Sequence, residues 1–288
     1  MKICAITMVY RDYWALSQWY AHYSRHLGSE HLYIVAHGSD PKISELCPRA
    51  SVITVPRDNL NGFDRERGQM LNSFQDALGV CYDWVIRTDA DELICIDPAH
   101  YASFEDLLTS CSAPAVFALG LNVAEIDGDN EVKPGDVALA NREHAVFSGH
   151  YSKAWAVRRG VHMNRHGVRV RPPRLHKFPF HLPQGVYLAH LKYAHLDALI
   201  DANRHRIDIA SGEERGLPGP AWRDADKDAK KFFKSLSKLP EIGWDEAKDT
   251  AYRSVLEEPV RDDALNTVRS KSISFKFRTT LPEWFKES

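Results

Sequence analysis

Three carboxylates follow one short apolar segment in the first half of the chain. Residues 84–93 read Trp-Val-Ile-Arg-Thr-Asp-Ala-Asp-Glu-Leu, which places Asp89, Asp91 and Glu92 at the end of a strand-like run. Side chains at positions i and i+2 of an extended segment share a face, so Asp89 and Asp91 can converge on one point. Paired carboxylates suit Mg²⁺ or Mn²⁺, ions that also accept phosphate or water oxygens. The motif indicates metal-assisted chemistry on a phosphate-bearing substrate. Its alternative interpretation is a surface turn after a strand.

The composition is that of an ordinary globular protein. The chain has 288 residues, of which 44% are hydrophobic and 26% are charged, enough for one large α/β domain or a domain with a smaller appendage. The formal net charge of −2 gives no electrostatic reason to expect nucleic acid as a partner. Apolar runs stay well below the roughly 18 residues that a transmembrane helix needs, so none is expected.

Cysteine usage and the first residues bear on the compartment. The first apolar run, residues 3–9, is too short for a signal peptide and is predicted to be a strand. The five cysteines are dispersed without metal-binding spacing, which indicates reduced thiols that serve in packing. We expect a cytoplasmic protein, in peripheral contact with the inner face of the membrane if its acceptor lies there. The cysteines are Cys4, Cys47, Cys81, Cys95 and Cys111.

Strand-like and helix-like segments alternate in the first half of the chain, which predicts a parallel sheet with right-handed crossovers. Ligands bind such sheets beyond the carboxyl ends of the strands. Tyr10, Asp40 and Asp89 each lie just past a predicted strand, so one nucleotide-like ligand could touch all three. Predicted strands cover residues 2–9, 31–36, 51–55 and 83–87, and predicted helices cover 14–26 and 65–78, the latter capped by Asp64.

The second half is less regular. Residues 216–220 contain two glycines and two prolines and are predicted to be a linker or a lid hinge. The tail, residues 270–288, is basic with interleaved aromatic residues. Pro282 and two glutamates in this tail favour packing on the domain over membrane binding. Predicted strands cover residues 115–123, 150–157 and 186–191, and predicted helices cover 197–211, 223–237 and 244–256.

In combination, several of these segments resemble the family-2-like glycosyltransferases of GT-A fold, in the branch whose metal motif reads Asp-x-Asp-Glu-Leu or Asp-x-Asp-Glu-Phe. The resemblance spans roughly residues 1–200, and the last third of the chain has no part in it. Two positions depart from the family pattern: Arg11-Asp12 stands where Asn-Glu is usual, and His37-Gly38 stands where Asp-Asn is common. The donor nucleotide therefore stays open. The matching segments are residues 6–12, 19–28, 34–40, 67–72, 84–93, 152–157 and 190–193.

The resemblance implies a fold and a domain organisation. We expect an α/β structure of GT-A type, with a Rossmann-like, mostly parallel central sheet flanked by helices and a helical C-terminal extension. The glycosyltransferase domain would cover residues 1–212, with a nucleotide-binding half at 1–97 and an acceptor half at 98–212. The extension would cover residues 213–288.

The resemblance also implies a function. The expected reaction is metal-dependent and moves a sugar from a nucleotide-sugar donor to a hydroxyl of a polysaccharide, glycolipid or related acceptor, with inversion. Mn²⁺ or Mg²⁺ across the donor phosphates would stabilise the charge of the leaving diphosphate. Two alternatives stay open: a nucleotidyltransferase that forms nucleotide-sugars, and a non-catalytic carbohydrate-binding or scaffold protein of the same fold. The absence of glycine directly after the first strand counts against the nucleotidyltransferase.

Individual residues receive roles on the same basis. Asp91, Asp89 and His190 are the expected metal ligands, and Glu92 is expected to orient them. The general base of an inverting transfer would come from the acceptor-facing region, where Asp127, Glu125 and Glu143 are the candidates and Asp136, His176 and His181 are alternatives. Contacts to the nucleotide-sugar are expected from Met8, Tyr10, Arg11, Asp40, Arg67, Gln69, Asp89, Lys153 and Lys192.

Overall fold

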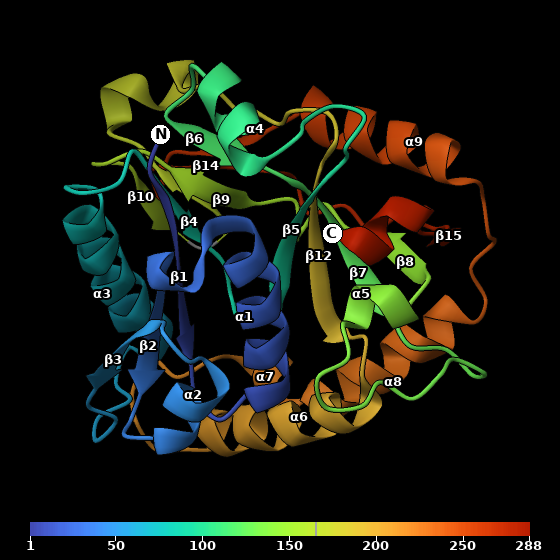
Figure 1. Cartoon of the computed structure of the whole chain (residues 1–288), viewed down its shortest axis with the longest axis horizontal. Coiled ribbons are helices and arrows are strands. Elements are labelled where there is room, and N and C mark those ends of the chain that lie inside the picture. The colour runs from blue at the N-terminus through green and yellow to red at the C-terminus, as the bar shows by residue number, and fades with distance from the viewer. Residues whose placement is uncertain (165) are drawn as a thin grey trace.

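The computed structural model describes residues 1–164 and 166–288. It is an α/β structure in which two sheets lie side by side and helices cover them, as Figure 1 shows. The fold class expected from the sequence, a largely parallel central sheet flanked by helices, is confirmed by this arrangement.

The first sheet contains the parallel strands. Its order is β3-β2-β1-β4-β9-β6, in which the contacts β3–β2, β2–β1 and β1–β4 are parallel and the last two are antiparallel. All seven residues of β1 are buried, as expected for a central strand covered on both faces. The strands are β1 (Ile3–Val9), β2 (Leu32–His37), β3 (Ser51–Val55), β4 (Trp84–Arg87), β6 (Ala115–Phe117) and β9 (Ala154–Val157).

Two amphipathic helices sandwich this sheet. The helix α1 (Tyr13–Leu27) buries Leu16, Trp19 and Tyr23 in the main core, where β1 and β4 contribute Ala5 and Ile86. On the opposite face, α3 (Phe63–Leu78) packs against alternate residues of the same strands in a smaller cluster. The two helices therefore hold β1 and β4 from both sides, and the carboxyl ends of these strands are held in a fixed position.

The second sheet has the order β15-β8-β7-β12-β5, and only its β7–β12 pair is parallel. The chain passes from the first sheet to the second between β4 and β5, and again between β6 and β7. The first passage, residues 88–91, contains the Asp-x-Asp motif, which therefore lies at the seam between the sheets. The strands are β5 (Glu92–Ile96), β7 (Leu119–Ala124), β8 (His144–Phe147), β12 (Val186–Tyr193) and β15 (Thr279–Thr280).

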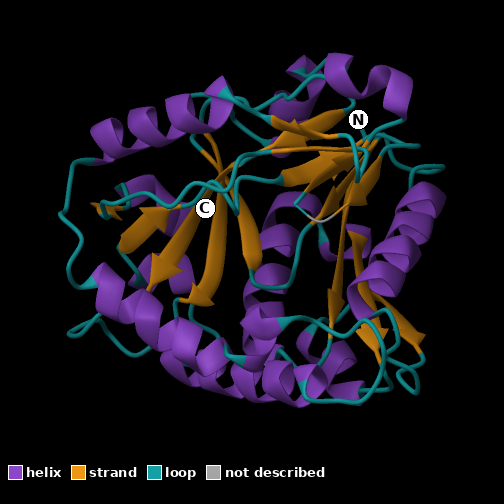
Figure 2. Cartoon of the chain, turned by 180° about the vertical axis from the view of Figure 1, so that it is seen from behind, coloured by secondary structure: helices purple, strands orange, loops and turns teal. Residues whose placement is uncertain are grey.

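A layer of helices lies beyond the carboxyl ends of the strands. In Figure 1 and in the reverse view of Figure 2, α6, α7 and α8 run beneath the arrowheads of β1, β2 and β12. Helix α6 contacts both α7 and α8, so the three form one layer. Their bounds are α6 (Leu196–Ala210), α7 (Pro220–Arg223) and α8 (Ala225–Leu236), and the remaining helices are α2 (Pro41–Leu46), α4 (Phe104–Ser110), α5 (Ala138–Asn141) and α9 (Trp244–Glu257).

The last third of the chain is helical only in part. Besides α7, α8 and α9 it adds β15 to the second sheet and builds half of a small antiparallel sheet of order β10-β11-β14-β13. The aromatic tail packs on the domain: Phe285 is fully buried, and its ring contacts those of Tyr187 and Trp244. The strands of the small sheet are β10 (His162–Asn164), β11 (Gly167–Arg169), β13 (Val260–Asp262) and β14 (Thr267–Arg269), and short 3₁₀ helices cover Ser29–His31, Pro172–Lys177 and Glu283–Glu287.

Two local predictions are wrong, and one strand was not predicted. The helix predicted from residue 65 begins at Phe63 with Gly62 as its N-cap, so Asp64 lies in its first turn and does not cap it. The strand predicted over 115–123 is divided at Ala118, where the chain changes sheets. A separate strand, β5, follows the carboxylates, because Glu92–Ile96 pairs antiparallel with β12. The apolar pattern of a sequence shows where strands lie but does not show which strand or which sheet each of them pairs with.

All five cysteines are free, and four of them are buried; Cys81 is exposed. None of the described helices combines the length and the apolar character that a bilayer crossing requires.

One glycine determines how close the second sheet approaches the loop before β9. A Cβ built on Gly120 of β7 would lie 2.2 Å from the carbonyl carbon of Tyr151 and 2.4 Å from its oxygen. The amide of Gly120 also donates to the Ser152 hydroxyl at 2.9 Å. Gly120 is therefore required by close backbone approach, and this approach sets the position of the next residue, Lys153.

We expect Gly120→Ala to lower the free energy of unfolding by about 1–3 kcal/mol, because the new Cβ clashes with backbone atoms, which cannot rotate away as a side chain can. Gly68→Ala is the matched control, since its Cβ would meet nothing within 4 Å and helical alanine is favoured over glycine. Chemical denaturation of both variants measures the difference. Equal stability of the two variants would contradict the close approach.

Candidate active site

A large open cavity of about 2940 Å³ lies at the carboxyl ends of the strands. Its walls come from the ends of β1, β2 and β4, from α3, and from the helices α6, α7 and α8 beyond the strand ends. Ligand pockets in proteins are usually roughly 300–1,000 Å³, so this cavity has room for a nucleotide together with a second substrate. The Asp-x-Asp turn lies in its wall.

The turn itself is closed by hydrogen bonds at both ends. The amide of Glu92 donates to the Asp89 carbonyl at 3.1 Å, and the amide of Asp89 donates to the Glu92 side chain at 3.1 Å. The amide of Leu191 in β12 donates to the Asp91 carbonyl at 2.7 Å. These bonds join the turn to the second sheet and hold the Asp91 side chain beside β12.

Lys153 lies between two of the three carboxylates. Its Nζ is 2.6 Å from Glu92 Oε1 and 3.1 Å from Asp89 Oδ2, and the Glu92 side chain is only 1% exposed. Burial lowers the pKa of Lys153, but the two carboxylates outweigh burial and raise it. Lys153 in turn lowers the pKa of Asp89, while burial raises that of Glu92. The ammonium is therefore charged, and both oxygens of Glu92 are engaged.

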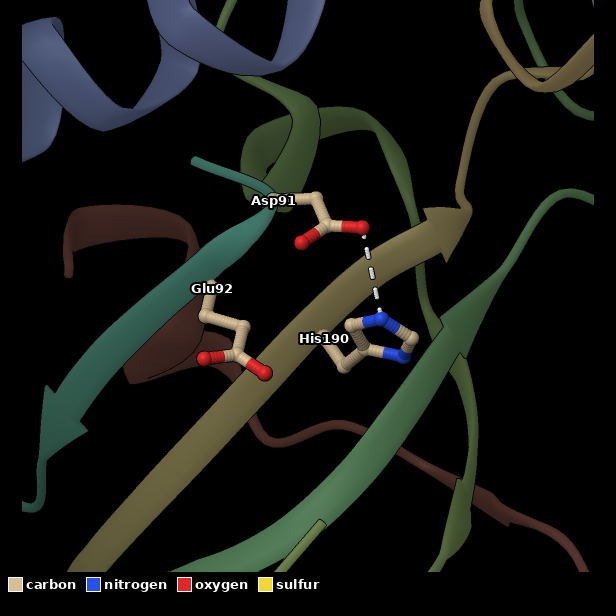
Figure 3. Close-up of side chains that lie close together, drawn as sticks. All are labelled: Asp91, Glu92 and His190. Atoms are coloured by element: carbon tan, nitrogen blue, oxygen red, sulfur yellow. Dashed lines mark ion pairs between the residues drawn. The ribbon is translucent and has the colours of Figure 1, made fainter. Parts of the chain in front are cut away.

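Asp91 and His190 face one another across the seam (Figure 3). Asp91 Oδ2 is 3.4 Å from His190 Nε2, and His190 Nδ1 is 2.7 Å from Asn122 Oδ1. Because the Asn122 oxygen can only accept, Nδ1 carries a proton and donates it. Burial lowers the pKa of His190, which favours the neutral ring with a lone pair on Nε2. Two acceptors then point at one another, as two ligands of one cation would.

The ligand atoms of Asp91, Glu92 and His190 all lie within 4.8 Å of one another, and among the described residues this trio is the group that could hold a metal ion. Glu92 already accepts from Lys153 and from the Asp89 amide, so its contribution is to hold the turn. Asp91 and His190 are the two groups whose facing atoms suit Mn²⁺ or Mg²⁺.

Two further side chains support this centre. The ring of Tyr151 stacks on that of His190, with centroids 3.8 Å apart and an interplanar angle of 23°. Arg206 of α6 places Nη2 3.6 Å from Asp91 Oδ2. Burial alone would raise the pKa of Asp91, but the positive charge that His190 carries when protonated and that of Arg206 bring it below its usual range, so Asp91 is ionised. The imidazole is thus held by a hydrogen bond on one edge and by a ring on one face.

Several cations in the cavity wall are available for phosphate. Lys192 is half-buried, and no described carboxylate forms an ion pair with it; burial lowers the pKa of its ammonium, and nearby Arg206 adds to this. Arg87 ends β4, donates to Asn72 Oδ1 at 2.7 Å and has its pKa lowered by burial to about 10. Arg67 lines the same wall from α3. Anions are favoured where such cations converge.

Most of the residues predicted to contact the nucleotide-sugar line this cavity. Two do not. Asp40 caps α2, accepting from the Lys42 amide at 3.1 Å and from the Tyr13 hydroxyl at 2.8 Å. Arg11 is exposed, and its guanidinium lies 5.3 Å from the centre of the Tyr10 ring. Those that do line the cavity are Met8, Tyr10, Arg67, Gln69, Asp89, Lys153 and Lys192.

The three candidates for a general base lie outside the cavity lining. Glu125 forms an ion pair with the buried Arg142 and accepts from the Leu196 amide at the start of α6. Glu143 pairs with Lys286 at 3.1 Å, and Asp127 is exposed on the loop after β7. These acids stabilise the surroundings of the site or face solvent. The alternatives Asp136, His176 and His181 are likewise outside the lining.

Four cavity residues around Asp91 and His190 were not predicted from the sequence. Asn122, Tyr151 and Arg206 reach Asp91 or His190 only through tertiary contacts, and no local motif marks them. Asp12 could have been found from the sequence, because it stands where the glycosyltransferases that the chain resembles usually have a glutamate at the start of the first helix. It caps α1 and lines the cavity, and burial together with Asp91 raises its pKa to about 6.

Comparisons with known proteins give distant likenesses only. No family model matches the chain, and no curated protein matches it. A CMP:2-keto-3-deoxy-manno-octonic acid synthetase in complex with CTP is 14% identical, with 55% of this chain and 75% of that one covered and a TM-score of 0.29. A mannose-1-phosphate geranyltransferase from Thermus thermophilus is 9% identical, with 97% of this chain and 74% of that one covered and a TM-score of 0.31. Likenesses this distant do not decide the function.

We expect Lys153→Met to destabilise the protein by about 3–5 kcal/mol near pH 8, because it leaves Glu92 buried without its counter-ion. Without Lys153, burial keeps the pKa of Glu92 raised in the folded state. A raised folded pKa gives stability that is present at acid pH and lost as pH rises, so the penalty should grow above the unfolded value of about 4. Denaturation at several pH values measures it.

The double variant Glu92→Gln with Lys153→Met is the control, because a neutral amide carries no charge to bury. It should recover part of the lost stability and show a flatter pH dependence than Lys153→Met alone. A single variant as stable as the wild type at pH 8 would contradict the proposed role of the ion pair.

Proposed function

We propose that this protein is a metal-dependent glycosyltransferase that moves a sugar from a nucleotide-sugar donor to a hydroxyl of a polysaccharide, glycolipid or related acceptor. The observation that carries the proposal is the approach of Asp91 Oδ2 and His190 Nε2, 3.4 Å apart in the wall of a cavity with room for a nucleotide and a second substrate. Two converging acceptors are stable when a cation lies between them, and a divalent ion is the partner of a diphosphate.

The residues around the pair suit the leaving diphosphate. Bound Mn²⁺ or Mg²⁺ would act as a Lewis acid towards the phosphate oxygens on which charge develops. Asn122 holds the His190 tautomer that presents Nε2, and Tyr151 holds its ring plane. Lys192 and Arg206 provide positive charge next to Asp91. The chain's own groups thus place cations where phosphate charge increases.

An inverting transfer also needs a proton acceptor near the attacking hydroxyl. Asp12 is our candidate, because it lines the cavity near Asp91 and its pKa of about 6 lies close to neutral pH. This choice replaces the three acids favoured from sequence, which lie outside the cavity lining.

A second candidate function is the formation of a nucleotide-sugar by nucleotidyl transfer. The observation that favours it is the additional positive charge in the cavity wall. Besides Lys192 and Arg206, which lie near Asp91, the wall contains Arg67, Arg87 and Arg169. A nucleoside triphosphate together with a sugar phosphate brings more negative charge than a nucleotide-sugar does. Against it, the segment between β1 and α1 contains no glycine to form a phosphate-binding loop.

The metal role of Asp91 is tested by thermal denaturation with Mn²⁺ and UDP, GDP or CDP. We expect at least one pair to stabilise the wild type by about 2–3 kcal/mol at roughly a hundredfold excess over its dissociation constant. Asp91→Asn should lose this stabilisation, since one ligand of the cation is gone. Asp201→Asn, at an exposed acid paired with Arg204 on α6, is the matched control and should retain it. Retained stabilisation in Asp91→Asn would remove the metal from this turn.

The two candidate reactions differ in their products. Glycosyl transfer or hydrolysis of a nucleotide-sugar should release a nucleoside diphosphate in the presence of Mn²⁺. Nucleotidyl transfer from a nucleoside triphosphate to a sugar phosphate should release pyrophosphate. We expect metal-dependent diphosphate release that Asp91→Asn lowers at least about a hundredfold, a typical loss when one electrostatic contact to a transition state is removed. Pyrophosphate release alone would support the second candidate.

A further inference from the structure

One face of α8 is a row of lysine side chains. Positions three, four and seven residues apart lie on the same side of a helix, so the four lysines of α8 share one face. A fifth lysine follows in the turn directly after the helix, and all five side chains are exposed. This lysine row consists of Lys227, Lys230, Lys231, Lys234 and Lys238.

The opposite face of α8 packs against the rest of the protein. Ala225, Ala229 and Leu236 are buried there. The ring of Phe232 stacks on that of Tyr193, the last residue of β12, with centroids 3.6 Å apart and an interplanar angle of 7°. This packing fixes the rotation of the helix about its axis, so the lysine row faces solvent.

The positive charge of the lysine row is not neutralised by the described residues, because none of their carboxylates forms an ion pair with its five lysines. The two acids of α8 lie to the sides of the row. Asp226 accepts from Asn203 of α6 at 2.9 Å, and Asp228 lines the cavity near Lys192. The whole chain has a formal net charge of −2, so this positive charge is local. Such a face attracts an anionic partner.

The surroundings of the row favour a bilayer as this partner. Helix α6 lies beside α8, as Figures 1 and 2 show, and its Leu196 and Ile200 are 42% and 48% exposed, one turn apart. Of the two acids on this stretch of α6, Asp201 is paired with Arg204. A soluble polyanion would use the lysines alone, whereas the headgroup region of an anionic bilayer accepts basic and apolar side chains together. Lys231 also lines the cavity, so the cavity opens beside the row.

We propose that the lysine row and the exposed apolar side chains of α6 bind the surface of a membrane that contains anionic lipids. The inference goes beyond the proposed function and does not depend on it, since it requires neither nucleotide nor metal. Each lysine close to an anionic bilayer strengthens binding about fivefold, and the effects of several lysines multiply. A protein bound in this way holds its cavity next to the lipid headgroups, where the hydroxyl of a glycolipid acceptor lies.

The test is sedimentation of the full chain with phosphatidylcholine vesicles, with and without about 30% phosphatidylglycerol. We expect binding to the anionic vesicles only, and its loss at high salt, because salt screens exposed charges. The combined substitution Lys227→Gln, Lys230→Gln and Lys234→Gln should weaken binding on the order of a hundredfold. Arginine at the same three positions should retain it, because the charge is unchanged. Lys231 is left in place because it lines the cavity.

The control variant replaces three exposed lysines outside the layer of α6, α7 and α8, and changes the net charge by the same amount. It should bind anionic vesicles as the wild type does. A melting temperature of each variant without vesicles shows whether the fold is retained. The control substitutions are Lys2→Gln, Lys177→Gln and Lys271→Gln.

The other outcomes contradict the inference. Equal binding to both kinds of vesicle, or equal loss of binding in the row variant and the control, would show that the lysine row is not a membrane-binding surface. If the wild type binds dextran sulfate but not anionic vesicles, the partner is a soluble polyanion. If it binds neither, the row is a solvated helix face. None of these results affects the proposed function, which Mn²⁺-dependent nucleotide binding tests separately.

Discussion

The ammonium of Lys153, buried between Glu92 and Asp89, is the interaction on which the candidate site depends. Without it, the carboxylates of this turn would repel one another, and Glu92 would lie in the interior without a counter-ion. With it, the turn after β4 keeps one carboxylate for structure and leaves Asp91 facing His190. The position of Lys153 in turn follows from the close approach of β7 at Gly120, where no side chain fits.

The seam between the two sheets explains why the site has this location. The chain leaves the parallel sheet after Arg87 and enters the second sheet at Glu92, so the turn belongs to both. His190 comes from β12, the neighbour of β5 in that second sheet, and Asn122 comes from β7 on the other side of β12. Two adjacent strands therefore bring the imidazole and its orienting amide to the carboxylate through backbone pairing alone.

The cavity has two chemically different ends. Near the seam, cations and acidic groups converge, as a divalent ion and a diphosphate require. At the ends of β1 and β2, the rings of Tyr10 and Phe63 and the imidazole of His37 line the cavity. The helices α6, α7 and α8 all contribute residues to the cavity wall, so the last third of the chain takes part in it although the family resemblance stops before these helices. The extension is thus part of the candidate site.

The sequence alone was enough to predict the alternation of strands and helices, the position of the carboxylate turn and a cavity-lining position for seven of the nine residues expected to contact the nucleotide-sugar, because these follow from local periodicity and from strand ends. It could not predict that Glu125 pairs with Arg142, that Arg206 lies beside Asp91, or that Asn122 bonds His190. The roles of such residues depend on partners that are distant in the sequence, and only tertiary packing selects among them. The tautomer of His190 was decided in the same way, by the one neighbouring group that its Nδ1 meets.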